Sequence, residues 1–145
     1  MKPRELLAQI DESQIIAAIA RAESRTSGEI RVSVSHRSAP GDPITHARKE
    51  FLRLKMDRTR HRNAVLIYLA PLNRSLAIVG DTAIHQRCGE AHWKTLANQL
   101  TASVHHGDFT PALTDTITRI GDLLAQHFPR PTDNPDALPN TLAHS

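Results

Sequence analysis

Cysteine is nearly absent from this sequence: Cys88 is the only one in 145 residues. No internal disulfide can form, and a single cysteine favours a reducing compartment. Long apolar runs are missing too. No window approaches the roughly 20 apolar residues of a membrane span, and the basic start at 1–11 has no apolar stretch long enough for a signal peptide. We therefore expect a soluble, cytoplasmic protein with no membrane insertion.

Aromatic residues make up only 3% of the chain, although 39% of it is hydrophobic and 23% is charged. These proportions are typical of a globular domain. The core must then be aliphatic and rich in alanine, which suits helices packed closely on a sheet. The formal net charge of +3 permits nucleic-acid binding without indicating it.

The strong catalytic and cofactor motifs are also missing. The sequence has no glycine-rich phosphate loop, no Cys-x-x-Cys, no HExxH and no serine nucleophile elbow. We therefore expect no nucleotide cofactor and name no catalytic residue. The histidines lack metal-ligand spacing; His105 and His106 stand at a predicted helix end, where imidazolium interacts favourably with the helix dipole. Cys88 is interpreted as a small buried hydrophobe.

Two short apolar runs within 63–81 organise the rest of the chain. The nearly continuous run 64–70 is typical of a strand covered on both faces. A four-residue turn leads from it into the β-branched run 75–80, so the two strands form an antiparallel hairpin. The alternating segment 29–35 predicts a strand with one polar face. The connection from there to 64–70 is long enough for a helical crossover, which makes those two strands parallel.

Capping residues and apolar spacing predict the helices. Asp11 with Gln14 forms a capping-box pattern that starts a helix running to about Arg25. Asp42 and Pro43 start a second helix. Further helices are predicted at 82–88, along the apolar face from Trp93 to Val104 with an end at Gly107, and from about 109 to 124, with Asp108 or Thr110 as the cap. The fold class is α/β: a three-layer, Rossmann-like α/β/α sandwich with a small mixed sheet.

We expect residues 1–128 to form the domain and residues 129–145 to form a tail. Phe128 and Pro129 close the globule in this interpretation. The tail holds four of the nine prolines and few large apolar groups. Such a segment is ordered only where it lies on the domain or on a partner.

The predicted strand order brings three polar side chains to one rim of the sheet. Glu29 begins its strand, Asn63 precedes the next, and Asp81 follows the last. Two carboxylates and a carboxamide offer the hard oxygen ligands that suit Ca²⁺ or Mg²⁺. A purely structural role is the alternative: Asp81 caps the helix at 82, Asn63 shapes a turn, and Glu29 pairs with an arginine.

The segment 46–62 is basic, with seven Lys or Arg against Glu50 and Asp57. Its charge suits phosphate, nucleic acid or an acidic partner. The alternative is a solvated helix face that docks the acidic tail. Phe51 is the only Phe, Tyr or Trp in this segment, and it lies on the predicted core face. The sequence therefore does not indicate aromatic stacking on nucleic-acid bases. The basic residues are Arg48, Lys49, Arg53, Lys55, Arg58, Arg60 and Arg62.

Four segments, taken in order, resemble a known family: Thr26–Ile30, Arg62–Tyr68, Asn73–Asp81 and Gly107–Thr110. Over about 12–128 the chain resembles the TPM domain, named for thylakoid lumen phosphatase, photosystem-repair and acetylcholine-receptor modulator proteins. It looks most like small stand-alone bacterial members. The resemblance implies an α/β/α sandwich without dinucleotide binding. It also implies Ca²⁺ or a related ion in some members, acid phosphatase activity in plant members, and roles in membrane-protein assembly or repair in others.

The chain departs from the family pattern around the rim. Ala64 replaces a glycine, Arg62 stands where an acid is frequent, and Asp81-Thr82 replace Tyr-Gly. Our first hypothesis is therefore a non-catalytic or weakly catalytic module that binds a protein partner through the basic helix or the tail, with a divalent ion at the rim. A metal-dependent acid phosphatase with Asp81 as ligand or base is the second, and nucleic-acid binding ranks last. The sequence specifies neither the substrate nor the oligomeric state.

Overall fold

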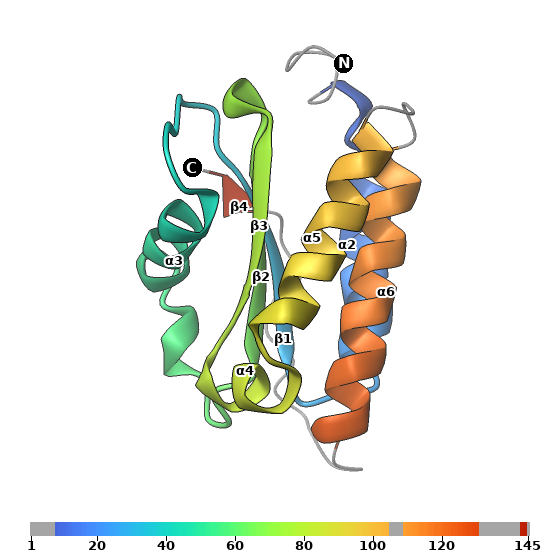
Figure 1. Cartoon of the computed structure of the whole chain (residues 1–145). Helices are drawn as coiled ribbons and strands as arrows, with labels where there is room; N and C mark the ends of the chain where they lie inside the picture. Colours follow the sequence, from blue (N-terminus) through green and yellow to red (C-terminus); the bar gives the residue numbers. More distant parts are fainter. Residues whose placement is uncertain (1–7, 105–108, 131–142, 145) are drawn as a thin grey trace.

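The chain folds as three layers, with a mixed sheet between helices, in a computed structural model that describes residues 8–104, 109–130 and 143–144. Figure 1 views the sheet edge-on, with α3 on one side and α2, α5 and α6 on the other. The strand order is β3-β2-β1-β4. The predicted α/β/α sandwich is confirmed.

The three predicted strands are present with the predicted directions. β1 (Glu29–Val34) pairs in parallel with β2 (Ala64–Ala70), and β2 pairs antiparallel with β3 (Ser75–Gly80). The hairpin turn is a short 3-10 helix, Pro71–Asn73, followed by Arg74 with a left-handed φ of 48°. Every residue of β2 is buried, as expected for a strand covered on both faces.

A fourth strand was not predicted. β4 (Ala143–His144) pairs in parallel with β1, so this part of the tail lies on the domain. A two-residue strand is too short to show a hydrophobic period, so no pattern in the sequence indicates it. Within the described residues, β4 therefore borders one edge of the sheet and β3 forms the other.

The helices begin where their capping residues stand. Asp11 accepts hydrogen bonds from Gln14 N and Nε2, at 3.3 and 2.9 Å, at the start of α2 (Glu12–Glu23). Asp42 caps α3 (Pro43–Arg53), whose first residue is the predicted proline. Asp81 caps α4 (Thr82–Cys88), and Gly89 ends it. The remaining helices are η1 (Met56–Arg58), α5 (Glu90–Val104) and α6 (Phe109–His127).

Two predicted helix boundaries differ from the structure, and a third lies outside the described residues. α2 ends at Glu23 instead of Arg25, because the chain turns there into a bridge between Thr26 and Pro129. Thr110 is inside α6 and does not cap it; its hydroxyl donates to Gln9 O at 2.5 Å. The predicted roles of His105, His106, Gly107 and Asp108 lie outside the described residues.

The sheet separates two cores, and both are mainly aliphatic, as predicted. Val65, Ile67 and Leu69 face α2, α5 and α6, where Ile117 and other apolar residues bury them. Leu66 and Tyr68 face α3 and pack with Phe51, Met56 and small alanines. Cys88 is partly buried against the larger core, and burial raises the pKa of its thiol. None of the helices in the described ranges has the length and apolar character needed to cross a bilayer.

Candidate functional site

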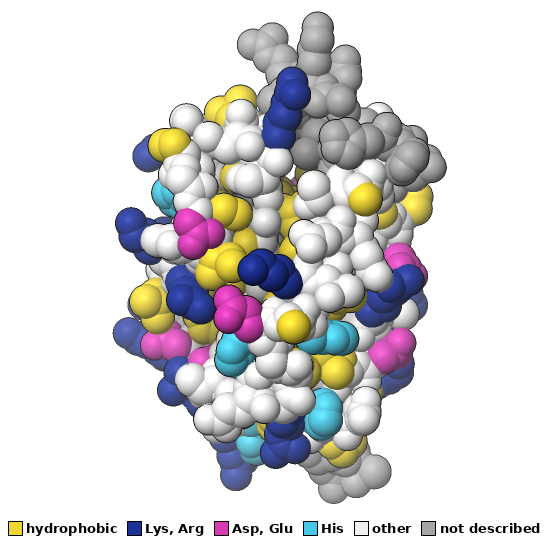
Figure 2. All heavy atoms as spheres, viewed as in Figure 1, with side chains coloured by type: hydrophobic (Ala, Val, Ile, Leu, Met, Phe, Trp, Pro, Cys, Tyr) yellow, Lys and Arg dark blue, Asp and Glu magenta, His cyan; other side chains and the backbone are white. Residues whose placement is uncertain are grey.

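A groove runs along β3, the sheet edge that faces the viewer in Figure 1. Its volume is about 540 Å³, within the range of ligand-binding clefts. α3 forms one wall and α5 the other, with η1 and α4 closing the end near Asp81. Figure 2, in the same view, shows hydrophobic side chains along the middle of this face, with charged side chains both among them and on the flanks.

The apolar surface of the groove comes from all three elements. β3 contributes Leu76 and Ile78 to the floor. α3 contributes Ile44, Phe51 and Leu52, and α5 contributes Trp93 and Ala97. Leu52 is 60% exposed, which makes it one of two large hydrophobic side chains that remain strongly exposed among the described residues; the other is Leu72, at 50%, in the hairpin turn.

Trp93 and Gly80 fit together at one end of the floor. Trp93 is 4% exposed. A Cβ at Gly80 would lie 2.7 Å from Trp93 Cζ2 and 3.0 Å from Ile84 Cγ2, so only glycine lets the indole pack against this end of β3. The indole Nε1 is buried and has no hydrogen-bond acceptor in the part of the chain that the structure describes. A buried donor without an acceptor is uncommon in folded proteins.

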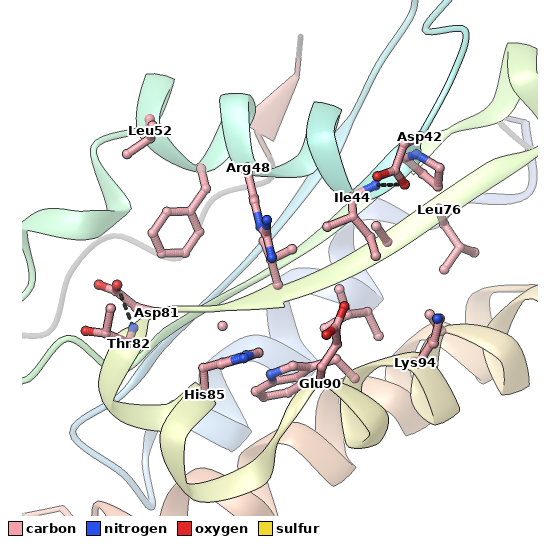
Figure 3. Close-up of a pocket in the computed structure, with 18 of the residues that line it drawn as sticks. Asp42, Ile44, Arg48, Leu52, Leu76, Asp81, Thr82, His85, Glu90 and Lys94 are labelled. Carbon is pink, nitrogen blue, oxygen red and sulfur yellow. Dashed lines mark hydrogen bonds between the residues drawn. The ribbon is translucent and has the colours of Figure 1, made fainter.

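Charged side chains reach into the groove from both walls. Figure 3 shows Arg48 pointing from α3 toward β3, with Glu90 and Lys94 rising from α5 on the other side. Across the described ranges, none of these three side chains forms an ion pair within 4.0 Å. Asp42, at the far end, is occupied as the cap of α3, where it accepts from Ile44 N at 3.1 Å.

The other end of the groove is closed by an ion pair between Arg62 and Asp81. Arg62 donates from Nε and from its terminal nitrogen to the two carboxylate oxygens of Asp81, at 2.7 and 2.8 Å. The hydrogen bond and the charge of Asp81 raise the pKa of Arg62. Asp81 also accepts from Thr82 N at 2.7 Å, so its predicted capping role is confirmed. Its side chain is 4% exposed.

The backbone brings the predicted rim residues to one end of the sheet, but their side chains have different partners. Glu29 is paired in register with Ala64, and Asp81 N donates to Ala64 O at 2.9 Å. Asn63 is buried and its amide donates to Ser27 Oγ at 3.2 Å, whereas Asp81 binds Arg62. Glu29 Oε1 is buried without a partner among the described residues, and burial raises the pKa of this carboxyl.

This arrangement does not fit a divalent ion as it stands. Arg62 occupies both oxygens of Asp81, so of the three side chains Glu29 alone offers an unengaged buried carboxylate oxygen. No group of three or more His, Cys, Asp or Glu side chains with metal-binding geometry occurs in the described ranges. A rim ion therefore stays a prediction, and it requires Arg62 to leave Asp81.

A second acidic pair, which the sequence did not predict, lies where α2 passes into β1. Glu23 Oε2 accepts from Ile30 N at 2.9 Å. Burial and the nearby charge of Glu29 raise the pKa of Glu23 to about 7, against the lowering effect of the Ile30 hydrogen bond and of Arg130. Arg130 donates to the backbone oxygen of Glu23 at 3.2 Å.

The predicted basic residues are all exposed but do not act as one surface. Arg53 is paired with the buried Glu50 at 2.5 Å, and Glu50 also accepts from the Ser33 hydroxyl. Arg62 is paired with Asp81, and Arg48 lines the groove. The remaining four lie outside the groove: Lys49, Lys55, Arg58 and Arg60.

Comparison with known proteins gives a family and a fold. The TPM domain matches this chain over residues 1–123. The structure of the BA42 protein from the psychrophilic bacterium Bizionia argentinensis is similar, with a TM-score of 0.81, 37% identity and 92% of each chain covered. No curated protein matches.

Two more distant structures share the fold. The N-terminal domain of cg2496 from Corynebacterium glutamicum has a TM-score of 0.59 at 19% identity, covering 90% of this chain and 81% of that one. The N-terminal domain of a P. gingivalis protein has a TM-score of 0.63 at 11% identity, covering 82% and 78%. The fold thus defines a small α/β/α domain. The chain belongs to the TPM domain family.

Proposed function

We propose that this TPM domain is a protein-interaction module and that the groove along β3 is its binding surface. The observation that carries the proposal is the groove itself: an apolar floor between two helical walls that present charged side chains. Apolar clefts with a few placed polar groups are the usual binding sites of proteins. The proposed interaction surface is therefore the groove beside α3, in place of the basic segment of α3 that the sequence suggested.

The exposed leucine on the α3 wall supports the same conclusion. Leu52 is 60% exposed beside Phe51, and both line the groove. Exposed apolar side chains that continue into a concave patch mark interaction sites more often than isolated ones do. Cys88, as the single cysteine, supports the cytoplasm as the place of action.

Metal-dependent phosphatase chemistry is less well supported. Such chemistry needs a cation or a free carboxylate at the reacting phosphate, whereas Asp81 is held by Arg62 and by Thr82 N. The phosphatase activity therefore stays a prediction, as does the ion, whose binding is tested by titration with Ca²⁺ and Mg²⁺.

Selection of peptides tests the proposal. A display library of random peptides of about ten residues is selected on the immobilised protein, and the recovered peptides are measured by fluorescence polarisation. We expect Leu52→Glu and Ala97→Arg each to weaken binding by about tenfold or more. Leu72→Glu is the matched control, because Leu72 is similarly exposed but lies outside the groove.

The result can go against the proposal in two ways. If the library gives no binder, or if the binders are as tight on Leu52→Glu and Ala97→Arg as on the wild type, the groove is not the interaction surface. Amide spectra of the variants must match the wild-type fold for the comparison to count.

A further inference from the structure

The backbone of β3 offers hydrogen-bonding groups to the groove. Asp81 N donates to Ala64 O, and hydrogen-bonded pairs alternate along an antiparallel ladder. Val79 lies opposite Leu66 and Ala77 lies opposite Tyr68, two and four residues before Asp81. The backbone groups of Val79 and Ala77 therefore bond to β2. The N–H and C=O groups at alternate positions point away from β2 toward the groove; they belong to Leu76, Ile78 and Gly80.

β3 lacks the features that usually block strand addition. Edge strands are commonly protected by charged residues, proline or a bulge. β3 has the sequence Ser-Leu-Ala-Ile-Val-Gly, and it pairs with β2 in regular register along its whole length. The groove walls from α3 and α5 flank this edge. An opening of this shape suits one extended chain, since helices on both sides obstruct a second folded sheet.

Trp93 gives a second, independent sign of a ligand. Its indole is nine-tenths or more buried, lines the groove beside Gly80, and has an unpartnered Nε1–H within the described part of the chain. Because the nitrogen itself is buried, a carbonyl or carboxylate oxygen in the groove would accept this hydrogen bond after a small shift of the indole toward the groove. Burial of this donor without an acceptor is unfavourable, so a ligand that supplies the acceptor is favoured.

The groove presents charges of both signs, and Arg48 is the one that the proposal uses. Asp81 and Arg62 neutralise each other, and Asp42 is held as a helix cap. Arg48 on α3 and Lys94 on α5 then line the groove from opposite walls, together with the carboxylates of Glu90 on α5 and Asp57 in η1. Among the described residues Arg48 forms no ion pair within 4.0 Å, so a carboxylate of the occupant would complement it. A strand sends successive side chains to opposite faces, so a bound strand would present one set to each wall.

We propose that the groove binds one extended polypeptide segment that adds to β3 as a further strand, with apolar side chains toward both walls and a carboxylate toward Arg48. This inference rests on the proposed function, because it requires the groove to bind polypeptide at all. It goes further by stating how the segment binds: through the backbone groups of Leu76, Ile78 and Gly80.

Backbone N-methylation tests the strand geometry. The tightest peptide from the selection is synthesised with one N-methyl group at a time along its length. We expect losses of about tenfold or more at alternate residues, whose N–H groups face β3, and little change at the residues between them. Amide hydrogen exchange of the complex should slow at Ile78 and Gly80 but stay the same at Ala77 and Val79, which already bond to β2.

Two charge-reversal variants on α3 test whether a carboxylate of the peptide binds Arg48. Arg48→Glu should weaken binding of a peptide that carries a carboxylate, whereas Lys49→Glu should not, because Lys49 is exposed on the same helix but does not line the groove. Equal weakening by both variants would mean that the basic segment binds the peptide through its overall charge, which would overturn the charge assignment.

The outcomes separate this inference from the proposed function. Binding that depends on Leu52 and Ala97, but shows no alternation under N-methylation and no protection of Ile78 and Gly80, would overturn strand addition and leave the groove as a binding site. Absence of any groove binder would overturn both. A concentration-dependent dimer in sedimentation, with those same amides protected, would make a second copy of this chain the occupant and would also overturn the inference.

Discussion

Asp81 fixes one end of the groove through a single buried carboxylate. Its oxygens accept from Arg62 and from Thr82 N, and its own backbone N–H donates to Ala64 O. The cap could be predicted, because it depends on the next residue alone. The pairing with Arg62 could not, since it depends on the path of the loop before β2, where Arg62 adopts a left-handed φ of 50°. The sequence therefore predicted the position of a rim residue correctly while leaving its partner unknown.

The Arg62–Asp81 ion pair should weaken the binding of Ca²⁺ and Mg²⁺ at the rim. Because Arg62 takes the place of a cation at Asp81, we expect any divalent ion to bind more weakly to the wild type than to Arg62→Gln. Titration with each ion, followed by amide shifts at Glu29, Asn63 and Asp81, measures this. Absence of shifts in both proteins would remove the ion from the rim, and tighter binding to the wild type would contradict the role given to Arg62.

Burial moves the pKa of the Glu23 carboxyl close to physiological pH. Burial raises its pKa from 4.5 to about 7. A raised carboxyl pKa means that the folded state holds a proton more tightly than the unfolded state does. The corresponding stability is fully present below about pH 4.5 and is lost as the pH rises to about 7.

Glu23→Gln should remove this pH dependence. Glutamine carries no charge to bury and can still accept from Ile30 N through its amide oxygen. Since Glu23 is partly exposed, we expect the variant to gain about 1–2 kcal/mol over the wild type at pH 8 and almost nothing at pH 4. Urea denaturation at both values measures the difference. A gain that is the same at both values would show that folding does not shift the pKa of Glu23.

At the scale of elements, α2 and α6 approach each other closely at one point. A Cβ at Gly121 of α6 would lie 2.6 Å from Ala22 Cβ and 3.1 Å from Ala22 Cα. The obstacle is therefore the α2 helix itself, and it cannot be relieved by rotating a side chain. Gly121 is a position where space, and not backbone conformation, requires glycine.

Gly121→Ala tests this packing. Helix propensity alone would stabilise the variant by about 1 kcal/mol, but overpacking costs about 1–3 kcal/mol. We expect net destabilisation, with part of it recovered when Ala22→Gly is added, because the second change removes the atom that clashes. Urea unfolding of the two variants measures both effects. A Gly121→Ala protein that is more stable than the wild type would contradict the described contact.

Most elements could be predicted because their signals are local. Asp11, Asp42 and Asp81 each cap the helix that follows, and the four-residue turn sets the hairpin. β4 could not be predicted, since two residues carry no pattern and their pairing depends on the path of the whole tail. The division of residues 1–128 from 129–145 stays a prediction, although Ala143–His144 lie on the sheet.

At the scale of the whole molecule, the candidate site lies along the β3 edge of the sheet, whereas the sequence predicted a site at the rim. The groove arises from the placement of α3 and α5 beside β3, and no single segment of sequence contains that information. One signal was present: the predicted topology left 75–80 at an edge, with no charge or proline to protect it. Trp93 was expected in the core, and its unpartnered nitrogen is visible only in the structure.

Amide shift mapping of the wild-type protein with the selected peptide tests the central claim most directly. We expect the shifts to lie on β3 and on the residues of α3 and α5 that line the groove, with Leu76, Ile78 and Gly80 among the largest. Shifts confined to the exposed basic residues Lys49, Arg58 and Arg60, or to the outer faces of α2 and α6, would contradict it.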